Sequence, residues 1–565
     1  MGDTYEYVVV GGGTAGALLA TRLAEAGREV ALVEWGPDDE HEPRARELRR
    51  WDEMLEGEYD LDYRSKPNEC GNSHLRMARL RILGGCSTAN TMIAWRPLPG
   101  DLEEWVSLGA DGWGPDEILP LYDRLRTPIH PVAEADRNPY VADVVTSATK
   151  ALGVPEQTHW NDGRRTDSAN GTGFFELGYT PETNLRSSTS IHYLHPSRTT
   201  PTGPKVLLGL RAVQLLLDHP PAPRPPAPRP AAPSTGSAAP PPVSAAHATG
   251  SAASASSSSA SASSASSASS AAASASAGGG PRVMGVRVRD GEGVEREIFA
   301  RREVVLCCGA IDSPRLLQLS GIGPREVLDA AGVPVVVDLP GVGENLQDHV
   351  EGLVVWEAKT TPPDVCASGW DAGAMITLGP DNRPDVMMHF PVEPWAVHAE
   401  RYLADHAEPP LPEHIVAIAP NVARPRSRGR VWIESSDPDA PPAIDYRSFT
   451  DDDGYDEQML LEGVRLARRI AAEEPMRSWL VREVFPGEHV EGTELSTIER
   501  DIHQTVYHVS GTCGIGPVVD PHLRVHGVQG LRIADASVFP TLTSVNPVVT
   551  VMLVAERAAD LLLLP

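Results

Sequence analysis

Runs of apolar residues that end in glycine turns predict alternating strands and helices at both ends of the chain. Residues 7–10 form a buried strand that runs into Gly11, and residues 17–26 form a helix that stops at Gly27. Strands are likewise predicted at 29–33, 304–309 and 531–535, and a helix at 313–319. Strands that alternate with helices favour an α/β fold.

Residues 219–280 break this pattern. The segment begins rich in proline and becomes an almost pure serine and alanine tract, which cannot bury enough apolar surface to offset its ordering entropy. It lies between two strand-like runs, 210–217 and 283–288, and we interpret it as a disordered insertion in a hairpin or meander loop. A proline-rich segment that binds a partner is the alternative.

The first predicted turn carries a glycine spacing typical of dinucleotide binding. Gly11, Gly13 and Gly16 permit a tight turn, a close approach of backbone to a diphosphate, and packing of helix on strand. The amide groups and dipole of the following helix favour the diphosphate. Glu34, at the end of the second strand, is placed to accept hydrogen bonds from a ribose diol. This unit does not distinguish FAD from NAD, and a glycine-rich turn without a ligand is the alternative.

Two polar residues near the other end of the chain complete a split signal. His508 and Asn546 each lie in a loop that precedes a predicted helix. If the first residues bind a dinucleotide and the last residues supply a base, the two ends of the chain must meet in the fold. This arrangement suits flavin-dependent oxidation.

Composition and charge narrow the class of protein. The chain has 565 residues, enough for a large core and two domains, and its net charge is -28, from 77 acidic and 49 basic residues. This charge argues against nucleic acid and anionic membrane surfaces as partners and is compatible with a cationic substrate. Six cysteines lack metal-ligand spacing, no apolar run reaches membrane-spanning length, and the first strand begins almost at Met1. We therefore expect a cytoplasmic protein with reduced thiols, no cleavable signal and no metal.

Several segments in order along the chain resemble the glucose–methanol–choline (GMC) oxidoreductase family. They are residues 83–90, 309–323, 341–349, 520–527 and 531–537. Within that family, residues 348–352 and 383–389 are most similar to choline oxidases and choline dehydrogenases. The resemblance covers nearly the whole chain outside the serine and alanine tract.

The resemblance implies a fold and a division into domains. The fold class is α/β, with an FAD-binding Rossmann-like domain of the p-hydroxybenzoate hydroxylase type and a substrate-binding domain on a mainly antiparallel sheet. The FAD-binding domain would comprise residues 1–150, 200–218, 281–341 and 500–565. The substrate-binding domain would comprise 151–199 and 342–499, and 219–280 would be the insertion.

The resemblance also implies a reaction, the oxidation of a primary or secondary alcohol to the carbonyl by hydride transfer to flavin N5. His508 falls on the family's active-site histidine, Asn546 on its second position, and His349 on a histidine that hydrogen-bonds the developing alkoxide. The hydroxyl proton must leave as the hydride moves, and a histidine that titrates near neutrality can accept it. Oxygen or another acceptor would reoxidise the flavin, and a homodimer is possible. Two alternatives are a flavin-containing lyase that acts on cyanohydrins and a flavin-binding protein whose active site has decayed. Neither would bleach its flavin with any alcohol.

The binding residues implied by the resemblance come from both ends of the chain. Trp51 and Tyr507 match an aromatic cage for the substrate, in which cation–π binding is possible. The expected cofactor contacts are Gly11, Gly13, Thr14, Ala15, Gly16, Glu34, Gly84, Gly85, Ser87, Asn90, Thr91, Ala212, Asp535, Ala536, Pro547 and Val548. Three of the predicted site residues also have local structural explanations. Asn546 and Pro547 suit the N-cap and first position of a helix, and Asp535 suits a turn. Such a helix would also point its positive end at the flavin.

The chain departs from choline oxidases at three positions. Ala89 stands where they tether FAD to a histidine, so we predict non-covalent FAD. Ala310 stands where they place a glutamate against the substrate ammonium, a contact worth about 1.5–3 kcal/mol, which argues against choline as the best substrate. Gly514 replaces the family's usual arginine and leaves the charge near that loop unassigned.

Overall fold

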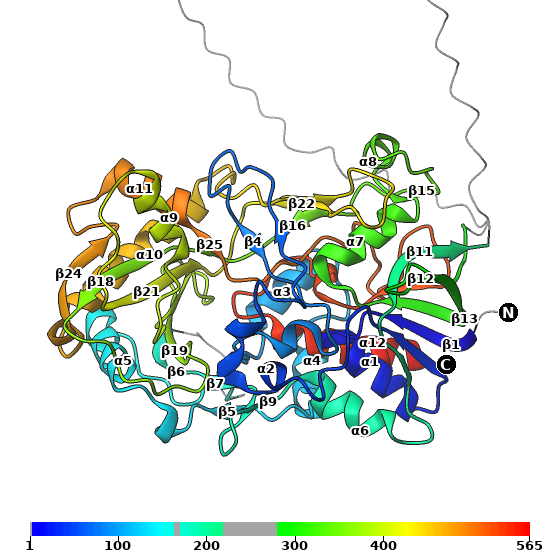
Figure 1. The fold of residues 1–565 in the computed structure, drawn as a ribbon, viewed down its shortest axis with the longest axis horizontal. Coiled ribbons are helices and arrows are strands. Elements are labelled where there is room, and N and C mark those ends of the chain that lie inside the picture. The colour runs from blue at the N-terminus through cyan, green and yellow to red at the C-terminus, as the bar shows by residue number, and fades with distance from the viewer. Residues whose placement is uncertain (1–2, 163–169, 219–279, 565) are drawn as a thin grey trace, which may run out of the picture. The chain divides into compact units, whose positions relative to one another are not determined.

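Two β-sheets organise the part of the chain that the computed structural model describes, residues 3–162, 170–218 and 280–564 (Figure 1). These residues belong to one compact unit. The predicted insertion at 219–280 lies outside the described residues except for Gly280.

The first sheet is built from the strands that the sequence predicts at the two ends of the chain. Its order is β10-β2-β1-β13-β12-β11, and β26 pairs with the C-terminal part of β13 at residues 304–306. Strands β10, β2, β1, β13 and β26 run parallel, and β11, β12 and β13 form an antiparallel meander. The strands are β1 (Asp3–Val10), β2 (Val30–Val33), β10 (Lys205–Leu207), β11 (Arg211–Leu217), β12 (Val283–Arg289), β13 (Glu295–Leu306) and β26 (Leu531–Ile533).

Three helices pack around this sheet and bring the chain ends together. Helix α1 (Thr14–Glu25) follows β1, α7 (Gly309–Leu319) follows β13, and α12 (Val548–Leu563) packs against α1. Gly27 has φ +77°, which confirms it as the stop after α1. The Tyr7 hydroxyl donates to the Leu562 carbonyl at 3.2 Å, and the blue and red segments lie side by side in Figure 1. The expectation that the first and last residues meet is confirmed.

A buried carboxylate holds α12 on α1. Glu556 is 0% exposed and accepts from Arg22 at 2.6 Å and from Arg124 at 3.0 Å. We expect Glu556→Gln to lower the free energy of unfolding by about 3 kcal/mol, the low end for a broken buried pair because both arginines keep some contact with water. Denaturant unfolding followed by tryptophan fluorescence measures this. Glu25→Gln, which breaks a half-exposed pair with Arg126 and a longer one with Arg22, should cost about 1 kcal/mol or less, and equal losses would contradict a special role for Glu556.

The second sheet is antiparallel and has the order β24-β18-β21-β20-β19-β6, with β17 and β25 attached through β21. Its strands are β6 (Gly171–Phe174), β17 (Val350–Glu351), β18 (Val354–Ala358), β19 (Ala372–Ile376), β20 (Val386–His389), β21 (Ile415–Val422), β24 (Leu480–Phe485) and β25 (Gln504–Thr505). Helices α5 (Pro139–Leu152), α9 (Val397–Asp405), α10 (Tyr455–Ala472) and α11 (Gly492–Ile502) accompany it. The α/β class with a second, antiparallel sheet is confirmed, whereas the domain boundaries stay a prediction.

Shorter elements connect these parts of the described chain. They are α2 (Pro43–Arg46), α3 (Pro99–Ser107), α4 (Pro115–Ile118), α6 (His195–Arg198), α8 (Arg325–Ala330), β3 (Tyr63–Arg64), β4 (Arg76–Met77), β5 (His130–Pro131), β7 (Glu176–Leu177), β8 (Tyr179–Thr180), β9 (Leu185–Arg186), β14 (Ile322–Gly323), β15 (Val337–Asp338), β16 (Glu344–Leu346), β22 (Gly429–Trp432) and β23 (Ala443–Asp445).

The hairpin predicted around the insertion is present. Strands β11 and β12 pair from Arg211↔Arg289 to Leu217↔Val283, and Asp218 N–H donates to the Arg282 carbonyl at 3.0 Å. Asp218 and Arg282, the described residues near the two ends of the insertion, therefore lie beside each other at one end of a paired hairpin.

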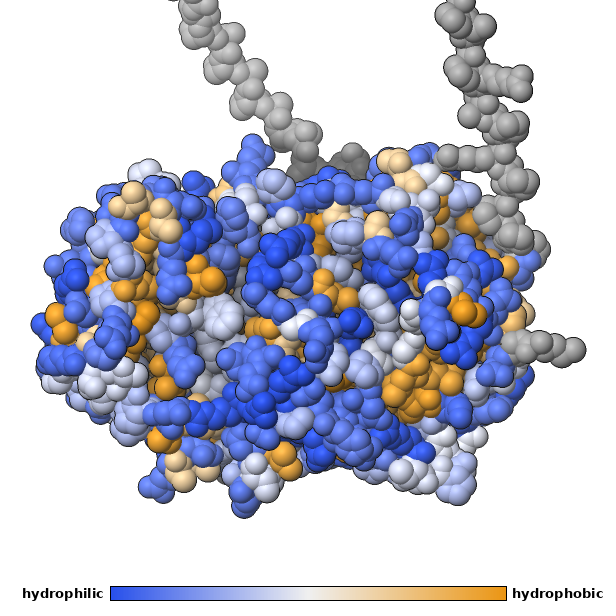
Figure 2. Space-filling model, viewed as in Figure 1, coloured by the Kyte–Doolittle hydropathy of each residue, from blue (hydrophilic) through white to orange (hydrophobic). Residues whose placement is uncertain are grey.

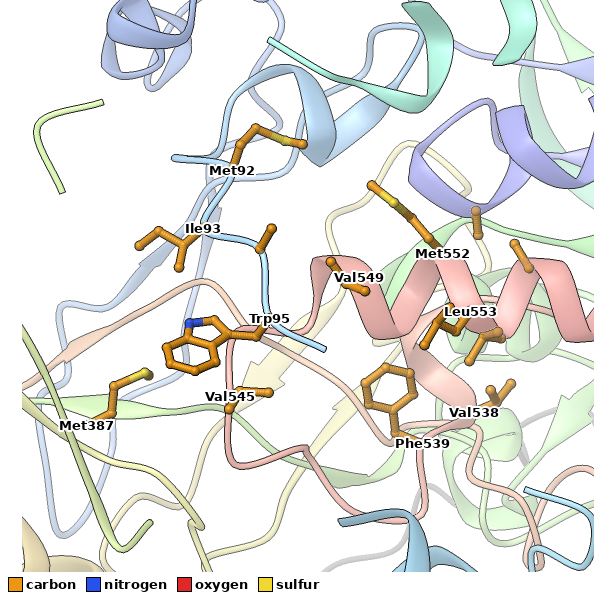
Figure 3. Close-up of a cluster of buried hydrophobic side chains, with 14 of the residues drawn as sticks. Met92, Ile93, Trp95, Met387, Val538, Phe539, Val545, Val549, Met552 and Leu553 are labelled. Carbon is orange, nitrogen blue, oxygen red and sulfur yellow. The ribbon is translucent and has the colours of Figure 1, made fainter. Parts of the chain in front are cut away.

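An apolar cluster holds the segment after the second glycine loop (residues 83–90) against the start of α12. Figure 3 shows Met92, Ile93 and Trp95 gathered with Val545, Val549, Met552 and Leu553, and all are buried. The face seen in Figure 2 is mainly hydrophilic, with apolar side chains in scattered patches. Within the described ranges, no helix combines the length and the apolar character needed to cross a membrane.

Candidate active site

A cavity of about 350 Å³ reaches from the carboxyl end of β1 to the edge of the second sheet at β17 and β20. Most of the residues singled out from the sequence line it. They are Gly11, Gly13, Thr14, Ala15, Glu34, Trp51, Gly85, Asn90, Thr91, Ala212, Tyr507, His508, Asp535, Ala536, Asn546, Pro547 and Val548. Four predicted site residues do not line the cavity, namely Gly16, Gly84, Ser87 and His349.

Two glycine loops face each other with bare backbone at one end of the cavity. A Cβ on Gly85 would lie 2.8 Å from the Gly13 Cα, and a Cβ on Gly16 would lie 1.9 Å from the Gly11 carbonyl oxygen. Gly11 and Gly84 have φ of +98° and +83°, which side-chain-bearing residues rarely adopt. The two loops therefore pack backbone against backbone, and Gly13, Thr14 and Ala15 expose the N-terminus of α1 to the cavity, where a diphosphate is favoured. Gly16 and Gly84 contribute by shaping these loops.

Two buried carboxylates mark the two sides of these glycine loops. Glu34 directly follows β2 and accepts from Gly12 N–H and Gly36 N–H, both at 2.7 Å, while burial raises its pKa to about 7. Asp535 accepts from Gly309 N–H at 2.8 Å and from the Ser313 hydroxyl at 2.6 Å, which joins the end of β26 to the start of α7. Both line the cavity, so Glu34 remains available to a ribose, and the turn-forming role of Asp535 coexists with a place at the cofactor.

His508 and His349 share a hydrogen bond that fixes the protonation of both rings. The two Nδ1 atoms are 2.8 Å apart, and the second ring nitrogen of His349, Nε2, lies 3.0 Å from the Ala423 carbonyl and 3.1 Å from the Thr543 carbonyl. Carbonyl oxygens only accept, so Nε2 of His349 carries a hydrogen. Burial lowers the pKa of His349 to about 4, so its ring is neutral and its Nδ1 accepts. His508 must then donate from Nδ1, which makes its Nε2 an acceptor.

The donor beside this nitrogen is the side-chain amide of Asn546. Its Nδ2 lies 3.4 Å from Nε2 of His508, and both residues line the cavity wall. Burial, followed by the neighbouring His349, lowers the pKa of His508 well below its ordinary value, so the ring is an unprotonated acceptor at neutral pH. The prediction that His349 hydrogen-bonds the alkoxide does not fit this geometry, because both of its ring nitrogens already form hydrogen bonds within the protein.

The loop that carries His508 is held in a strained conformation. Tyr507 has φ +63°, and the Asp348 carboxylate accepts from His508 N–H at 2.8 Å and from the Thr505 hydroxyl. Arg79 donates to the Tyr507 carbonyl at 3.0 Å. The pairing of β17 with β25 brings this loop beside His349. Asp348 and Arg79 were not among the predicted site residues, although Asp348 lies in a segment that carries the family resemblance.

Asn546 does not cap the final helix. Helix α12 begins at Val548 with Pro547 in the N-cap position and no side-chain capping bond, which corrects the prediction of Asn546 at N-cap and Pro547 at the first helical position. The side-chain amide instead points toward His508, and its Oδ1 is buried without a hydrogen-bond partner in the described structure. A buried polar atom at a cavity wall is accounted for when a ligand supplies its partner.

The far end of the cavity is walled by aromatic side chains. Trp51 and Tyr507, both predicted, are joined there by Trp370 and Trp395, and the Trp51 and Trp395 rings are 6.1 Å apart. Ala310 also lines the cavity and is 2% exposed, so no carboxylate stands at that position.

A second pair of titratable residues at this end was missed from the sequence. Glu351 and His389 are 2% and 1% exposed, line the cavity, and are joined by a 2.8 Å contact between Oε2 and Nδ1. Gln504 donates to the other carboxylate oxygen at 2.8 Å, and His389 Nε2 is buried without a partner among the described residues. Both residues stand in the two segments most similar to choline oxidases, but only the pairing of β17, β20 and β21 brings them together.

Comparison with known proteins agrees with this geometry. Two family models described as GMC oxidoreductase match the chain, over residues 5–226 with 249–351 and over 425–555. Choline oxidase from Arthrobacter globiformis is 38% identical, covering 99% of this chain and 94% of that protein. Oxygen-dependent choline dehydrogenase from Photobacterium profundum is 28% identical, covering 100% and 94%. The crystal structure of pyridoxine 4-oxidase from Mesorbium loti has a TM-score of 0.80 and 25% identity, covering 98% of each chain.

Proposed function

Because the chain belongs to the GMC oxidoreductase family and is therefore an FAD-dependent alcohol oxidoreductase, we propose that His508 is the base that accepts the alcohol's hydroxyl proton. The observation that carries this proposal is the 2.8 Å contact between the Nδ1 atoms of His349 and His508, which makes Nε2 the acceptor nitrogen of a residue that lines the cavity. An acceptor that is unprotonated at neutral pH and lies in the cofactor cavity has the position that this proton transfer requires.

FAD fits the cavity, since the N-terminus of α1 lines it at Gly13, Thr14 and Ala15, and Asn546 Oδ1 has no partner among the described residues. When bound there, it would supply the acceptor for the two electrons and the carbon-bound hydrogen of the alcohol. His508 Nε2 and the Asn546 Nδ2 amide, 3.4 Å apart, hold the hydroxyl oxygen between an acceptor and a donor. The amide stabilises negative charge on that oxygen as the proton leaves, without competing for the proton.

The substrate's other end sits among Trp51, Trp370, Trp395 and Tyr507, with the Glu351 carboxylate at the wall. We propose a small primary or secondary alcohol with a cationic head, because aromatic faces and a buried carboxylate both favour a positive charge. The similarity to choline oxidase supports this class. Ala310 removes one carboxylate from the same end, so choline itself should bind more weakly here than to an enzyme that keeps it.

Replacing Glu351 tests this proposal for the substrate. Glu351→Gln should raise the apparent dissociation constant of choline about 10-fold or more, because the quaternary ammonium loses the attraction of a buried carboxylate, and leave 3,3-dimethylbutan-1-ol, its neutral isostere, unchanged. Anaerobic bleaching of the flavin at increasing alcohol concentration measures both constants. Glu357→Gln on β18, where the carboxylate pairs with Arg482, is the matched control. Equal losses for both alcohols would show that Glu351 does not recognise charge.

We propose that the flavin is held without a covalent bond, because Ala89 offers no nucleophile to the cavity that it lines. Acid precipitation should therefore move the yellow colour into the supernatant. Colour that stays in the pellet, with a flavin peptide after digestion, would contradict the proposal, and Cys86 would be the first residue to examine.

We propose oxygen as the electron acceptor, because the two relatives are named choline oxidase and oxygen-dependent choline dehydrogenase. The amount of hydrogen peroxide formed per alcohol oxidised tests this proposal. No relative or structure reported above is named as a lyase, and a lyase would leave the flavin oxidised with every alcohol. Cytoplasmic location and a homodimer remain predictions from the sequence.

A further inference from the structure

Arg186, the last residue of β9, is a buried cation that the proposed chemistry does not use. It is 1% exposed, and no acidic residue of the described chain contacts its guanidinium. Burial alone lowers its pKa to about 9, so the side chain remains charged at neutral pH. Buried arginines are normally paired with a carboxylate, and an unpaired one lowers the stability of the fold.

Only one end of this guanidinium is engaged by the protein. Nη1 donates to the carbonyl of Asn90, with longer contacts to the Asn90 side-chain oxygen at 3.2 Å and the Ser87 carbonyl at 3.4 Å. Nε and Nη2 are buried without a hydrogen-bond partner in the described structure. The contacts at Nη1 hold the second glycine loop, and the positive charge itself is left uncompensated.

Arg186 lies close to the cavity, because it contacts a residue that lines it. Asn90 and Thr91 line the cavity, whereas Arg186 does not, so the guanidinium lies directly behind the loop that faces the cofactor. A buried charge is screened less than one in water, so the field of Arg186 extends to the part of the cavity that Asn90 lines. The loop fixes the position of the charge, so no reorganisation is needed when negative charge develops in the cavity.

We propose that Arg186 stabilises the negative charge that the flavin ring gains on reduction. Transfer of two electrons with one hydrogen nucleus leaves the ring with one additional negative charge, and a fixed cation behind Asn90 favours that state over the oxidised one. The N-terminus of α12 supplies a partial positive charge to the same cavity, and Arg186 supplies a full one. This inference requires FAD in the cavity but not the assignment of His508 as base, so either can fail alone.

Three substitutions separate the charge of Arg186 from its hydrogen bond. Arg186→Lys keeps the charge, Arg186→Gln keeps a donor for the Asn90 carbonyl without the charge, and Arg186→Met keeps neither. Arg482→Met, on β24 with the arginine side chain 63% exposed, controls for removal of a surface cation. If Arg186→Met fails to retain FAD, the lysine and glutamine variants still decide the question.

The measurements are the two-electron midpoint potential of the bound flavin, by equilibration with a reference dye, and the dissociation constant of sulfite. Sulfite bonds to the oxidised ring through its sulfur lone pair and leaves negative charge there, so it reports the same field without turnover. We expect Arg186→Gln and Arg186→Met to weaken sulfite binding at least 10-fold and to lower the potential by the equivalent, about 30 mV. Arg186→Lys and Arg482→Met should stay within threefold. Unchanged values in Arg186→Gln, or an equal loss in Arg186→Lys, would overturn the proposal.

Discussion

Replacing His508 by alanine should slow anaerobic bleaching of the flavin by about 10²–10⁴-fold at saturating alcohol, the usual contribution of a positioned general base. The lone pair of His508 Nε2 is the acceptor assigned to the hydroxyl proton, and neither Asn546 nor a neutral aromatic wall can replace it. Stopped-flow absorbance of the flavin measures the bleaching rate directly. The alcohol's dissociation constant should change much less, because the aromatic wall and Glu351 are untouched.

The pH dependence adds an independent test of this base. Because the pKa of His508 lies well below the ordinary value for histidine, the bleaching rate should be level from about pH 6.5 upward and fall only on the acid side. Protonation at low pH removes the acceptor, so the direction is a loss with falling pH. A His508→Ala enzyme that bleaches at the original rate, or an original enzyme whose rate rises as pH falls, would exclude His508 as the base.

Replacing His349 by leucine should lower the bleaching rate by about 10²-fold while the flavin remains bound. Leucine fills the buried site but cannot accept from the His508 Nδ1–H, so the His508 ring is free to rotate and to place its hydrogen on Nε2. The lone pair is then lost from the cavity in part of the population. A general-base contribution depends on the correct tautomer as well as on position.

His349→Gln provides the control for this prediction. Its side-chain oxygen can accept from His508 while its amide donates to the Ala423 and Thr543 carbonyls, which reproduces both contacts of the imidazole. We expect glutamine to restore most of the rate that leucine removes. Equal losses in the two variants would show that His349 does more than hold His508, and would favour a direct contact with the substrate.

The residues that could be predicted from the sequence are those whose role is written into local backbone. Gly11 and Gly16 had to be glycine for steric reasons that their spacing already expressed, whereas a Cβ on Gly13 would make only an ordinary 3.8 Å contact with Gly85. His508 and Asn546 belong to segments with a strong family resemblance, and both line the cavity. The antiparallel second sheet was likewise implied by the resemblance.

What the sequence could not provide depends on contacts between distant segments. The side of His508 on which His349 lies follows from the pairing of β17 with β25, which no local pattern expresses. Glu351 and His389 meet because their strands both pair with β21. The start of α12 was misplaced by one residue, because capping rules weigh the local backbone and Asn546 is instead turned toward His508.

The hydrogen bond between Tyr7 and Leu562 has a consequence for biosynthesis. At a translation rate of about 5–20 residues per second, roughly half a minute to two minutes separate emergence of the first glycine loop from that of Asn546. During this time β1 and α1 are on the ribosome without their partner α12. Cofactor loading must therefore follow synthesis of α12, and premature termination before α12 should yield a chaperone client without flavin.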